Sequence, residues 1–230
     1  MMAEPFYKRL IVSCQAREGE PFRDSASMAR FAVSAVAGGA AGIRARGPED
    51  IRAIRQAVGV PIIGIAKEMW TDGKILITPT FESAQELMAA GADMIALDVT
   101  RRGQQYGALD RLRRIRQELQ VPVLADIATL DEALAAAGVG ADFVLSTMRG
   151  YTDETMSIQF FDLAFIQELV QRSPVPVIAE GRIHTPQQAG AALAAGAYAV
   201  VVGSAITRPV TIARRFADAI ASLEVGGNRP

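Results

Sequence analysis

The chain has 230 residues, of which half are hydrophobic and 21% are charged, and its 24 Lys and Arg against 25 Asp and Glu give a net charge of −1. This balance argues against a disordered chain and gives no electrostatic reason to expect a nucleic acid as partner. The single cysteine, Cys14, excludes an internal disulfide framework and a cysteine-cluster metal site. The single histidine, His184, excludes a two-histidine metal motif, so we expect no metal site.

Two segments are candidates for targeting or membrane segments, and neither has the required pattern. The N-terminal stretch MMAEPFYKRL has no apolar core before its first charges, so we expect no signal peptide. Residues 189–207 carry no charge, but Gly196 divides the stretch and its second half is a short β-branched run. This pattern predicts a helix followed by a buried strand rather than a membrane span. We therefore expect a cytoplasmic protein with no membrane partner.

Along the chain, eight short apolar runs alternate with longer segments of helical periodicity. The apolar runs, which predict strands, cover residues 10–14, 42–45, 61–65, 94–97, 122–125, 143–146, 176–179 and 199–202. The helical segments cover residues 28–36, 49–58, 82–90, 109–119, 130–137, 163–171, 186–195 and 212–223. Near-continuous apolar strands between amphipathic helices are typical of a parallel sheet that helices cover.

Capping residues mark where the predicted helices begin. A capping box runs from Thr129 to Glu132, and Thr185 is followed by Pro186 at the first helical position. Because eight β/α units follow one another without a linker, residues 1–230 are predicted to form one α/β domain, a (β/α)8 TIM barrel. A doubly wound open sheet is the alternative fold, and the even spacing of the eight units favours the barrel.

The predicted fold indicates where chemistry can occur. In (β/α)8 barrels the active site lies at the carboxyl ends of the strands. The candidate residues are those that end or follow the eight predicted strands, namely Gln15, Arg44, Lys67, Asp98, Asp126, Arg149, Glu180 and Gly203.

Lys67 and Glu180 are the candidates for acid–base chemistry. A lysine that emerges from a barrel strand is partly desolvated, which disfavours its charged form and makes it a usable base or Schiff-base nucleophile. Glu180 is the best candidate for a second acid or base. The alternatives are an exposed Lys67 at the start of a loop, and a Glu180 that only pairs with a nearby arginine or lysine.

Three further candidates have positioning roles. Asp126 and Asp98 can orient substrate hydroxyls or Lys67, or serve only as helix caps and ion-pair partners. Arg44 can bind a carboxylate, an amide oxygen or a phosphate through its forked guanidinium, or can lie at the barrel rim as an exposed charge.

Two glycine turns predict a phosphate site. Gly181 and Arg182 follow the seventh strand, and Gly203 and Ser204 follow the eighth. These two loops often bind phosphate in this fold, because glycine lets backbone N–H groups approach the anion and a helix N-terminus adds partial positive charge. The alternative is that the glycines only permit tight turns.

Several motifs together resemble a known family. The chain carries LIVSCQA, GGAAGIRARGPEDI, PIIGIAK, ITPTFES, GADMIALDVT, AEGRIHTPQQA and VVVGSAITRP. In these segments, almost from end to end, it resembles the N-acetylmannosamine-6-phosphate 2-epimerases of bacterial sialic acid catabolism. The SCQA segment and the last two motifs are the most specific. The chain departs from the family pattern at residues 68–70, 99–103 and 146–152, and we expect these departures to affect loop contacts more than the reaction.

The resemblance implies a cofactor-free isomerase that interconverts N-acetylmannosamine 6-phosphate and N-acetylglucosamine 6-phosphate. It implies Lys67 as the catalytic lysine and Glu180 as its acidic partner. The substrate contacts that it implies fall on Gln15, Arg44 and Asp126. The implied phosphate contacts fall on Gly181, Arg182, Gly203 and Ser204, with Arg208 a weaker candidate.

Other functions remain open at this point. The residues also fit another phosphosugar isomerase, a lyase that uses Lys67 as a Schiff base, or a non-catalytic protein that binds sugar phosphates. The expected partner is a phosphorylated N-acetylhexosamine, and the Ala-rich final helix is compatible with a homodimer.

Overall fold

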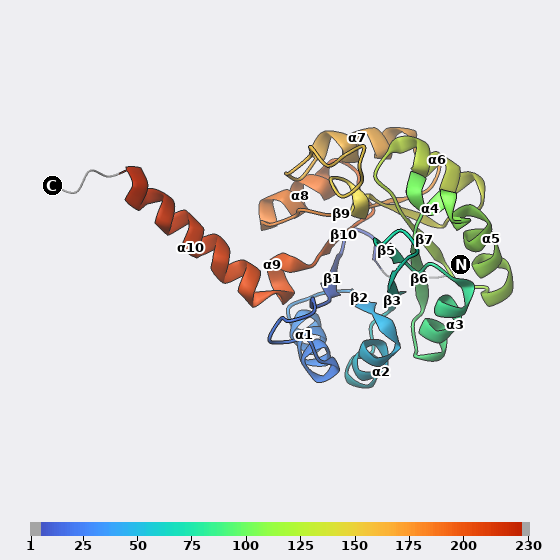
Figure 1. The fold of residues 1–230 in the computed structure, drawn as a ribbon, viewed down its shortest axis with the longest axis horizontal. Coiled ribbons are helices and arrows are strands. Elements are labelled where there is room, and N and C mark those ends of the chain that lie inside the picture. The colour runs from blue at the N-terminus through green and yellow to red at the C-terminus, as the bar shows by residue number, and fades with distance from the viewer. Residues whose placement is uncertain (1–5, 227–230) are drawn as a thin grey trace.

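The computed structural model describes residues 6–226, and its centre is a closed barrel of parallel strands (Figure 1). The strands follow one another around the barrel in the order β1-β10-β9-β8-β7-β6-β3-β2. Their bounds are β1 Leu10–Cys14, β2 Gly42–Arg46, β3 Ile62–Ile65, β6 Met94–Asp98, β7 Val123–Asp126, β8 Phe143–Leu145, β9 Val177–Glu180 and β10 Ala199–Val202. The predicted (β/α)8 barrel is confirmed, and each of its strands lies within one residue of the predicted run.

Helices surround the barrel and connect its strands. They are α1 Ser25–Ala37, α2 Gly47–Ala57, α3 Phe81–Ala89, α4 Arg101–Gln105, α5 Ala108–Leu119, α6 Leu130–Gly138, α7 Leu163–Arg172, α8 Pro186–Ala194, α9 Ser204–Thr207 and α10 Pro209–Gly226. The first helix begins three residues earlier than predicted, because Asp24 caps it by accepting a hydrogen bond from the backbone N–H of Ser27. Apolar periodicity finds the buried face of a helix, whereas the capping residue sets its first turn.

The two-residue period of a strand separates two hydrophobic cores. Outward side chains of the strands pack on the helices, whereas inward ones fill the barrel together with Phe6, which is fully buried. A Cβ on Gly42 would lie 2.4 Å from Cε1 of Phe6, so this strand position requires glycine. The amino-terminal end of the barrel is therefore filled, and its carboxyl end is the side where polar side chains can meet.

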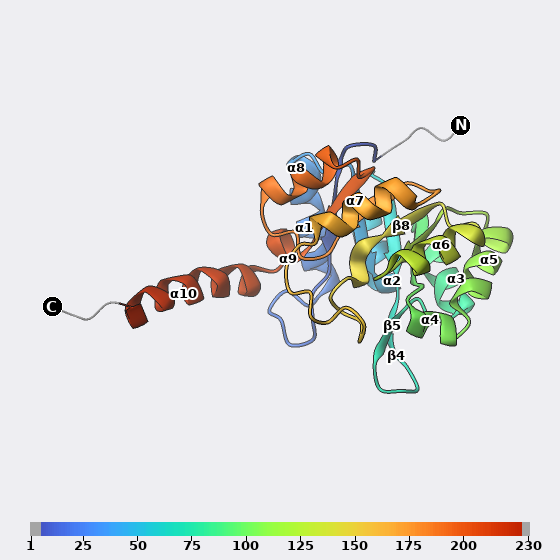
Figure 2. The same ribbon diagram turned by 90° about the horizontal axis from the view of Figure 1, so that it is seen from above.

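A short hairpin leaves the barrel wall after β3. It consists of β4 Lys67–Met69 and β5 Ile75–Ile77, and Figure 2 shows it projecting beyond the barrel on one side. Thr78 attaches the hairpin to the wall: its Oγ1 accepts from the N–H of Ala66 at 3.1 Å and donates to the carbonyl of Ala96 at 2.7 Å. This hairpin was not predicted from the sequence.

The last helix, α10, points away from the barrel (Figures 1 and 2). Two apolar residues that lie one turn apart on it are largely exposed, Phe216 at 69% and Ile220 at 62%. Among residues 6–226, no helix combines the length and the apolar character that a membrane crossing requires.

Candidate active site

The carboxyl ends of the barrel strands gather polar side chains at one mouth. Every second residue of a strand points into the barrel. The inward residues that follow the apolar Ile63, Ile65 and Leu145 are polar, and they lie over the apolar interior. The inward positions at this level are Ser13, Gln15, Arg44, Arg46, Lys67, Asp98, Asp126, Thr147, Glu180 and Gly203.

Arg44 forms the centre of a buried ion cluster. Its Nη1 and Nη2 donate to Oδ1 and Oδ2 of Asp126 at 3.0 and 2.6 Å, and Nη1 also pairs with Oε2 of Glu180. The side chains of Arg44 and Asp126 are 1% and 0% exposed, so Arg44 is not an exposed charge at the rim. This bidentate geometry fixes the guanidinium, and with it the position of Glu180.

Thr147 joins the same cluster. It lies in a 3-10 turn, η1 Ser146–Met148, directly after β8. Its Oγ1 lies 2.6 Å from Oδ1 of Asp126, 3.0 Å from Oε2 of Glu180 and 3.1 Å from Nη1 of Arg44. The sequence analysis missed this residue. The signal that could have found it is the inward period continued two residues past Leu145.

Lys67 approaches the mouth from the opposite wall. In the ring of eight strands, β3 and β9 are four positions apart, so Lys67 after β3 faces Glu180 at the end of β9. The contacts of Thr78 hold the backbone of Ala66, the residue before Lys67. The structure thus brings together a lysine and a carboxylic acid on opposite sides of one space.

Both of these groups have perturbed pKa values. Burial lowers the pKa of the Lys67 ammonium to about 8, and the Arg44 cation acts in the same direction. Burial raises the pKa of the Glu180 carboxyl, whereas Arg44 and Thr147 favour its ionised form. A lysine that releases its proton near neutral pH and a carboxyl that retains its proton to higher pH than usual are suited to proton transfer.

The two glycine turns lie side by side, because β9 and β10 are neighbours in the barrel. Gly181 has a φ of 102°, a conformation that side chains disfavour. A Cβ on Gly203 would lie 3.2 Å from Cβ of Ser13 on the adjacent strand, so glycine also allows close packing there. Ser204 begins α9 directly after this second turn.

Two arginines near these turns already have partners in the protein. The guanidinium of Arg208 donates from Nε to both carboxylate oxygens of Glu20, at 2.9 and 3.1 Å. That of Arg182 lies over the ring of Tyr151 at 4.6 Å and donates to the carbonyl of Gly150 at 2.9 Å. Both side chains therefore help to position loops.

Gln15 and Asp98 complete the mouth. Nε2 of Gln15 donates to Oγ of Ser13 at 2.7 Å, whereas its buried Oε1 has no hydrogen-bond partner within the described chain. Asp98 accepts from the N–H and Oγ1 of Thr100 at 2.9 and 2.5 Å, and burial raises its pKa to about 6. Gln15 thus presents a free acceptor, whereas Asp98 holds the first turn of α4.

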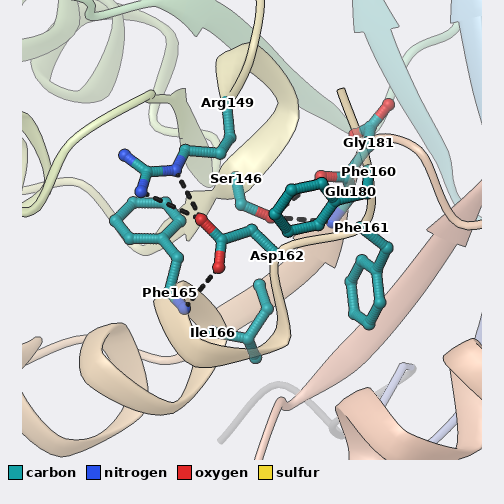
Figure 3. A pocket seen from close by; sticks show the side chains of 9 residues that line it. All are labelled: Ser146, Arg149, Phe160, Phe161, Asp162, Phe165, Ile166, Glu180 and Gly181. Atoms are coloured by element: carbon teal, nitrogen blue, oxygen red, sulfur yellow. Dashed lines mark hydrogen bonds and ion pairs between the residues drawn. The ribbon is translucent and has the colours of Figure 1, made fainter. Parts of the chain in front are cut away.

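Arg149 belongs to a different environment. It pairs with Asp162 at 2.9 Å and stacks on Phe165, beside a cavity of about 10 Å³ that is too small for a sugar (Figure 3). A cavity of about 370 Å³ instead lies next to Lys67, between α2 and α3, and includes Arg46 and Leu87 in its lining. Its size is in the range of small-molecule sites.

Comparisons with known proteins identify the family of the chain. Residues 28–222 match the family model described as "Putative N-acetylmannosamine-6-phosphate epimerase". Proteins named "Putative N-acetylmannosamine-6-phosphate 2-epimerase" include one from Caldanaerobacter subterraneus subsp. tengcongensis, 45% identical over 90% of this chain and 89% of its own length. Another, from Cutibacterium acnes, is 46% identical over 92% of this chain and 93% of its own.

A solved structure shows the same fold in detail. The N-acetylmannosamine-6-phosphate 2-epimerase from Clostridium perfringens superposes with a TM-score of 0.89 at 41% identity, covering 95% of this chain and 96% of the other. The family model covers residues 28–222, which include every residue of the ion cluster. The chain therefore belongs to the N-acetylmannosamine-6-phosphate epimerase family, whose members are carbohydrate isomerases.

Proposed function

We propose that the chain interconverts N-acetylmannosamine 6-phosphate and N-acetylglucosamine 6-phosphate in sialic acid breakdown, with Lys67 and Glu180 as its acid–base pair. In the open-chain sugar, the proton on C2 is acidic because the neighbouring aldehyde accepts the resulting charge. Its removal gives a planar enolate, and a proton returned to the other face of C2 inverts the centre. The reaction therefore needs two protonatable groups on opposite faces, or one that reaches both.

The position of Lys67 and Glu180 on opposite walls of the barrel is the observation that carries this proposal. In one direction Glu180 takes the C2 proton while the Lys67 ammonium gives one to the opposite face. In the other direction neutral Lys67 takes the proton and protonated Glu180 gives one. Both directions begin with a single proton shared between the two groups, so the same protein form serves both.

The phosphate of the substrate lies at the end of the sugar far from the reacting carbon, so it needs contacts away from Lys67. We propose that backbone groups at Gly181, Arg182, Gly203 and Ser204 bind the phosphate, across the mouth from Lys67. Arg208 contributes there only when its ion pair with Glu20 opens.

The opposite end of the sugar lies near Lys67. The cavity of about 370 Å³ beside this lysine has room for the acetamido group, which projects from the reacting carbon away from the phosphate. The free acceptor on Gln15 suits a substrate hydroxyl. Asp126 and Arg44 act by holding Glu180.

Proton NMR of the purified protein with N-acetylmannosamine 6-phosphate tests the function directly. The expected result is the appearance of the 2-epimer and of no fragment. A covalent adduct trapped by borohydride would instead indicate a Schiff-base lyase that uses Lys67. Conversion to a different phosphosugar, or tight binding without turnover, would support the other two alternatives.

We also propose that the whole chain acts as one catalytic domain in a homodimer in the cytoplasm, where phosphorylated sugars occur. The support for the dimer is the exposed apolar face of α10, which carries Phe216 and Ile220 and would pack against a second copy. Light scattering of Phe216→Glu should then show a monomer. Arg214→Glu, on another face of α10, should leave the dimer intact, and a monomeric wild-type protein would contradict the proposal.

A further inference from the structure

Thr147 places one hydroxyl among three charged groups. Its Oγ1 contacts Asp126 at 2.6 Å, Glu180 at 3.0 Å and Arg44 at 3.1 Å. A hydroxyl has one proton to donate and two lone pairs that accept. Because Arg44 can only donate, Thr147 accepts from it and gives its own proton to one of the two carboxylates at a time.

The contacts on Glu180 are unequal between its two carboxylate oxygens. Arg44 and Thr147 both bind Oε2. Within residues 6–226, Oε1 has no hydrogen-bond partner, and the side chain is 12% exposed. Ser146 fixes the backbone of Glu180, because its Oγ donates to the carbonyl at 2.8 Å and accepts from the N–H at 3.1 Å. The carboxylate is thus held by one oxygen, and the other is left without a hydrogen bond from the described chain.

We propose that Thr147 is a positioning residue for the epimerase reaction: its hydroxyl holds Oε2 of Glu180, so that Oε1 faces the C2 proton of the substrate. This inference rests on the proposed role of Glu180 as acid and base. Arg44 alone does not fix the carboxylate, because a single donor at Oε2 leaves rotation about the last side-chain bond free.

The charged groups that face Glu180 come from three other elements. They are Arg44 on β2, Asp126 on β7 and Lys67 on β4. Burial and Asp126 favour the protonated carboxyl, whereas Arg44 and the Thr147 hydrogen bond favour the ionised one. Loss of the hydroxyl should therefore raise the pKa of Glu180 further, in addition to loosening its orientation.

The test compares two substitutions at the same position. Thr147→Val keeps the shape and removes the hydroxyl, whereas Thr147→Ser keeps the hydroxyl. We expect Thr147→Val to lower kcat by about 10- to 100-fold with KM changed less than about 2-fold, as for a lost hydrogen bond to a charged group. The acid limb of the kcat–pH profile should move to higher pH. Thr147→Ser should restore both the rate and the limb.

A matched control separates this role from simple packing. Thr155 is also buried, at 3% exposure, and its hydroxyl accepts from the N–H of Gly150 at 2.9 Å. Thr155→Val can lower the melting temperature but should leave the acid limb of the profile in place. An unshifted acid limb in Thr147→Val, or a Thr147→Ser variant as slow as Thr147→Val, would overturn the proposal.

A measurement without substrate distinguishes a failure of this inference from a failure of the proposed function. The Glu180 resonance in carbon-13 spectra of glutamate-labelled protein is assigned by its absence in Glu180→Gln. Its titration should move to higher pH in Thr147→Val and return in Thr147→Ser. Identical titrations in the wild type and both variants would refute the positioning role, whether or not the protein turns over the epimerase substrate.

Discussion

Lys67→Arg removes proton transfer at this position while it retains the positive charge. Because burial lowers the pKa of Lys67 to about 8, its neutral form at pH 7 is about 300-fold more abundant than that of an ordinary lysine. An arginine keeps its proton throughout this range, so it can neither give a proton to the enolate nor take one from C2. We expect kcat to fall by about 10²- to 10⁴-fold, the usual contribution of a positioned acid or base.

The assay is proton NMR of the substrate at C2 in both directions, because a variant that blocks proton transfer must fail in both. Lys67→Met should lose a similar factor, since it retains the aliphatic stem without the ammonium. Lys74→Met is the matched control, because Lys74 lies in the turn of the same hairpin with its side chain 59% exposed. It should retain full activity.

Activity above about a tenth of wild type in Lys67→Arg would refute this reasoning, because the loss of transition-state stabilisation would then be under ~1.4 kcal/mol. A large loss in Lys74→Met would equally contradict it, since the effect would then belong to the hairpin and not to the proton carrier.

Three other predictions concern the same pair and the phosphate. The kcat–pH profile should be bell-shaped: it should fall above about pH 8, where Lys67 loses its proton and the pair holds none, and fall in acid, where Glu180 is protonated and the pair holds two. A rate that still rises at pH 9 would contradict this prediction. In D₂O, early product should carry deuterium at C2. Incorporation should be almost complete if Lys67 and Glu180 serve opposite faces, and partial if Lys67 alone returns one of three ammonium protons. Product without deuterium would exclude proton transfer. N-acetylmannosamine without its phosphate should lose kcat as well as affinity, because phosphate binding orients the reacting end, and equal kcat/KM for the two sugars would argue against the proposed site at Gly181 and Gly203.

The sequence was sufficient for the barrel because its strands are buried on both faces. Such strands read as uninterrupted apolar runs, and the polar residue that ends each run marks the mouth, as Lys67 and Glu180 do. Whether these residues meet is a tertiary question. Arg44 crosses the mouth from β2 and reaches Asp126 on β7. This contact depends on closure of the barrel, which no local sequence pattern encodes.

The elements that the sequence analysis missed are short and lack an apolar pattern of their own. The hairpin of β4 and β5 projects from the barrel, with Met69 at 69% and Ile75 at 51% exposure. It is attached through the hydrogen bonds of Thr78 and through those that Arg102 donates to its turn. Thr147 lies in a 3-10 turn two residues past the end of its strand, outside the apolar run that predicted the strand. The direction of α10 was equally unpredictable, because an amphipathic pattern predicts a buried face without indicating which surface buries it.

The charges of the site explain why one protein form can serve both directions of an epimerisation. Arg44 and Asp126 neutralise each other, which leaves Lys67 and Glu180 as the pair that we propose exchanges protons. The negative charge of an ionised Glu180 raises the pKa of Lys67, and this charge disappears when Glu180 takes up a proton. A proton gained by one group therefore favours its loss from the other, and the pair tends to hold one proton in total. In the proposed mechanism, the two arrangements of that proton are the starting states for the two epimers. The cluster that fixes Glu180 would then also keep both states accessible near neutral pH.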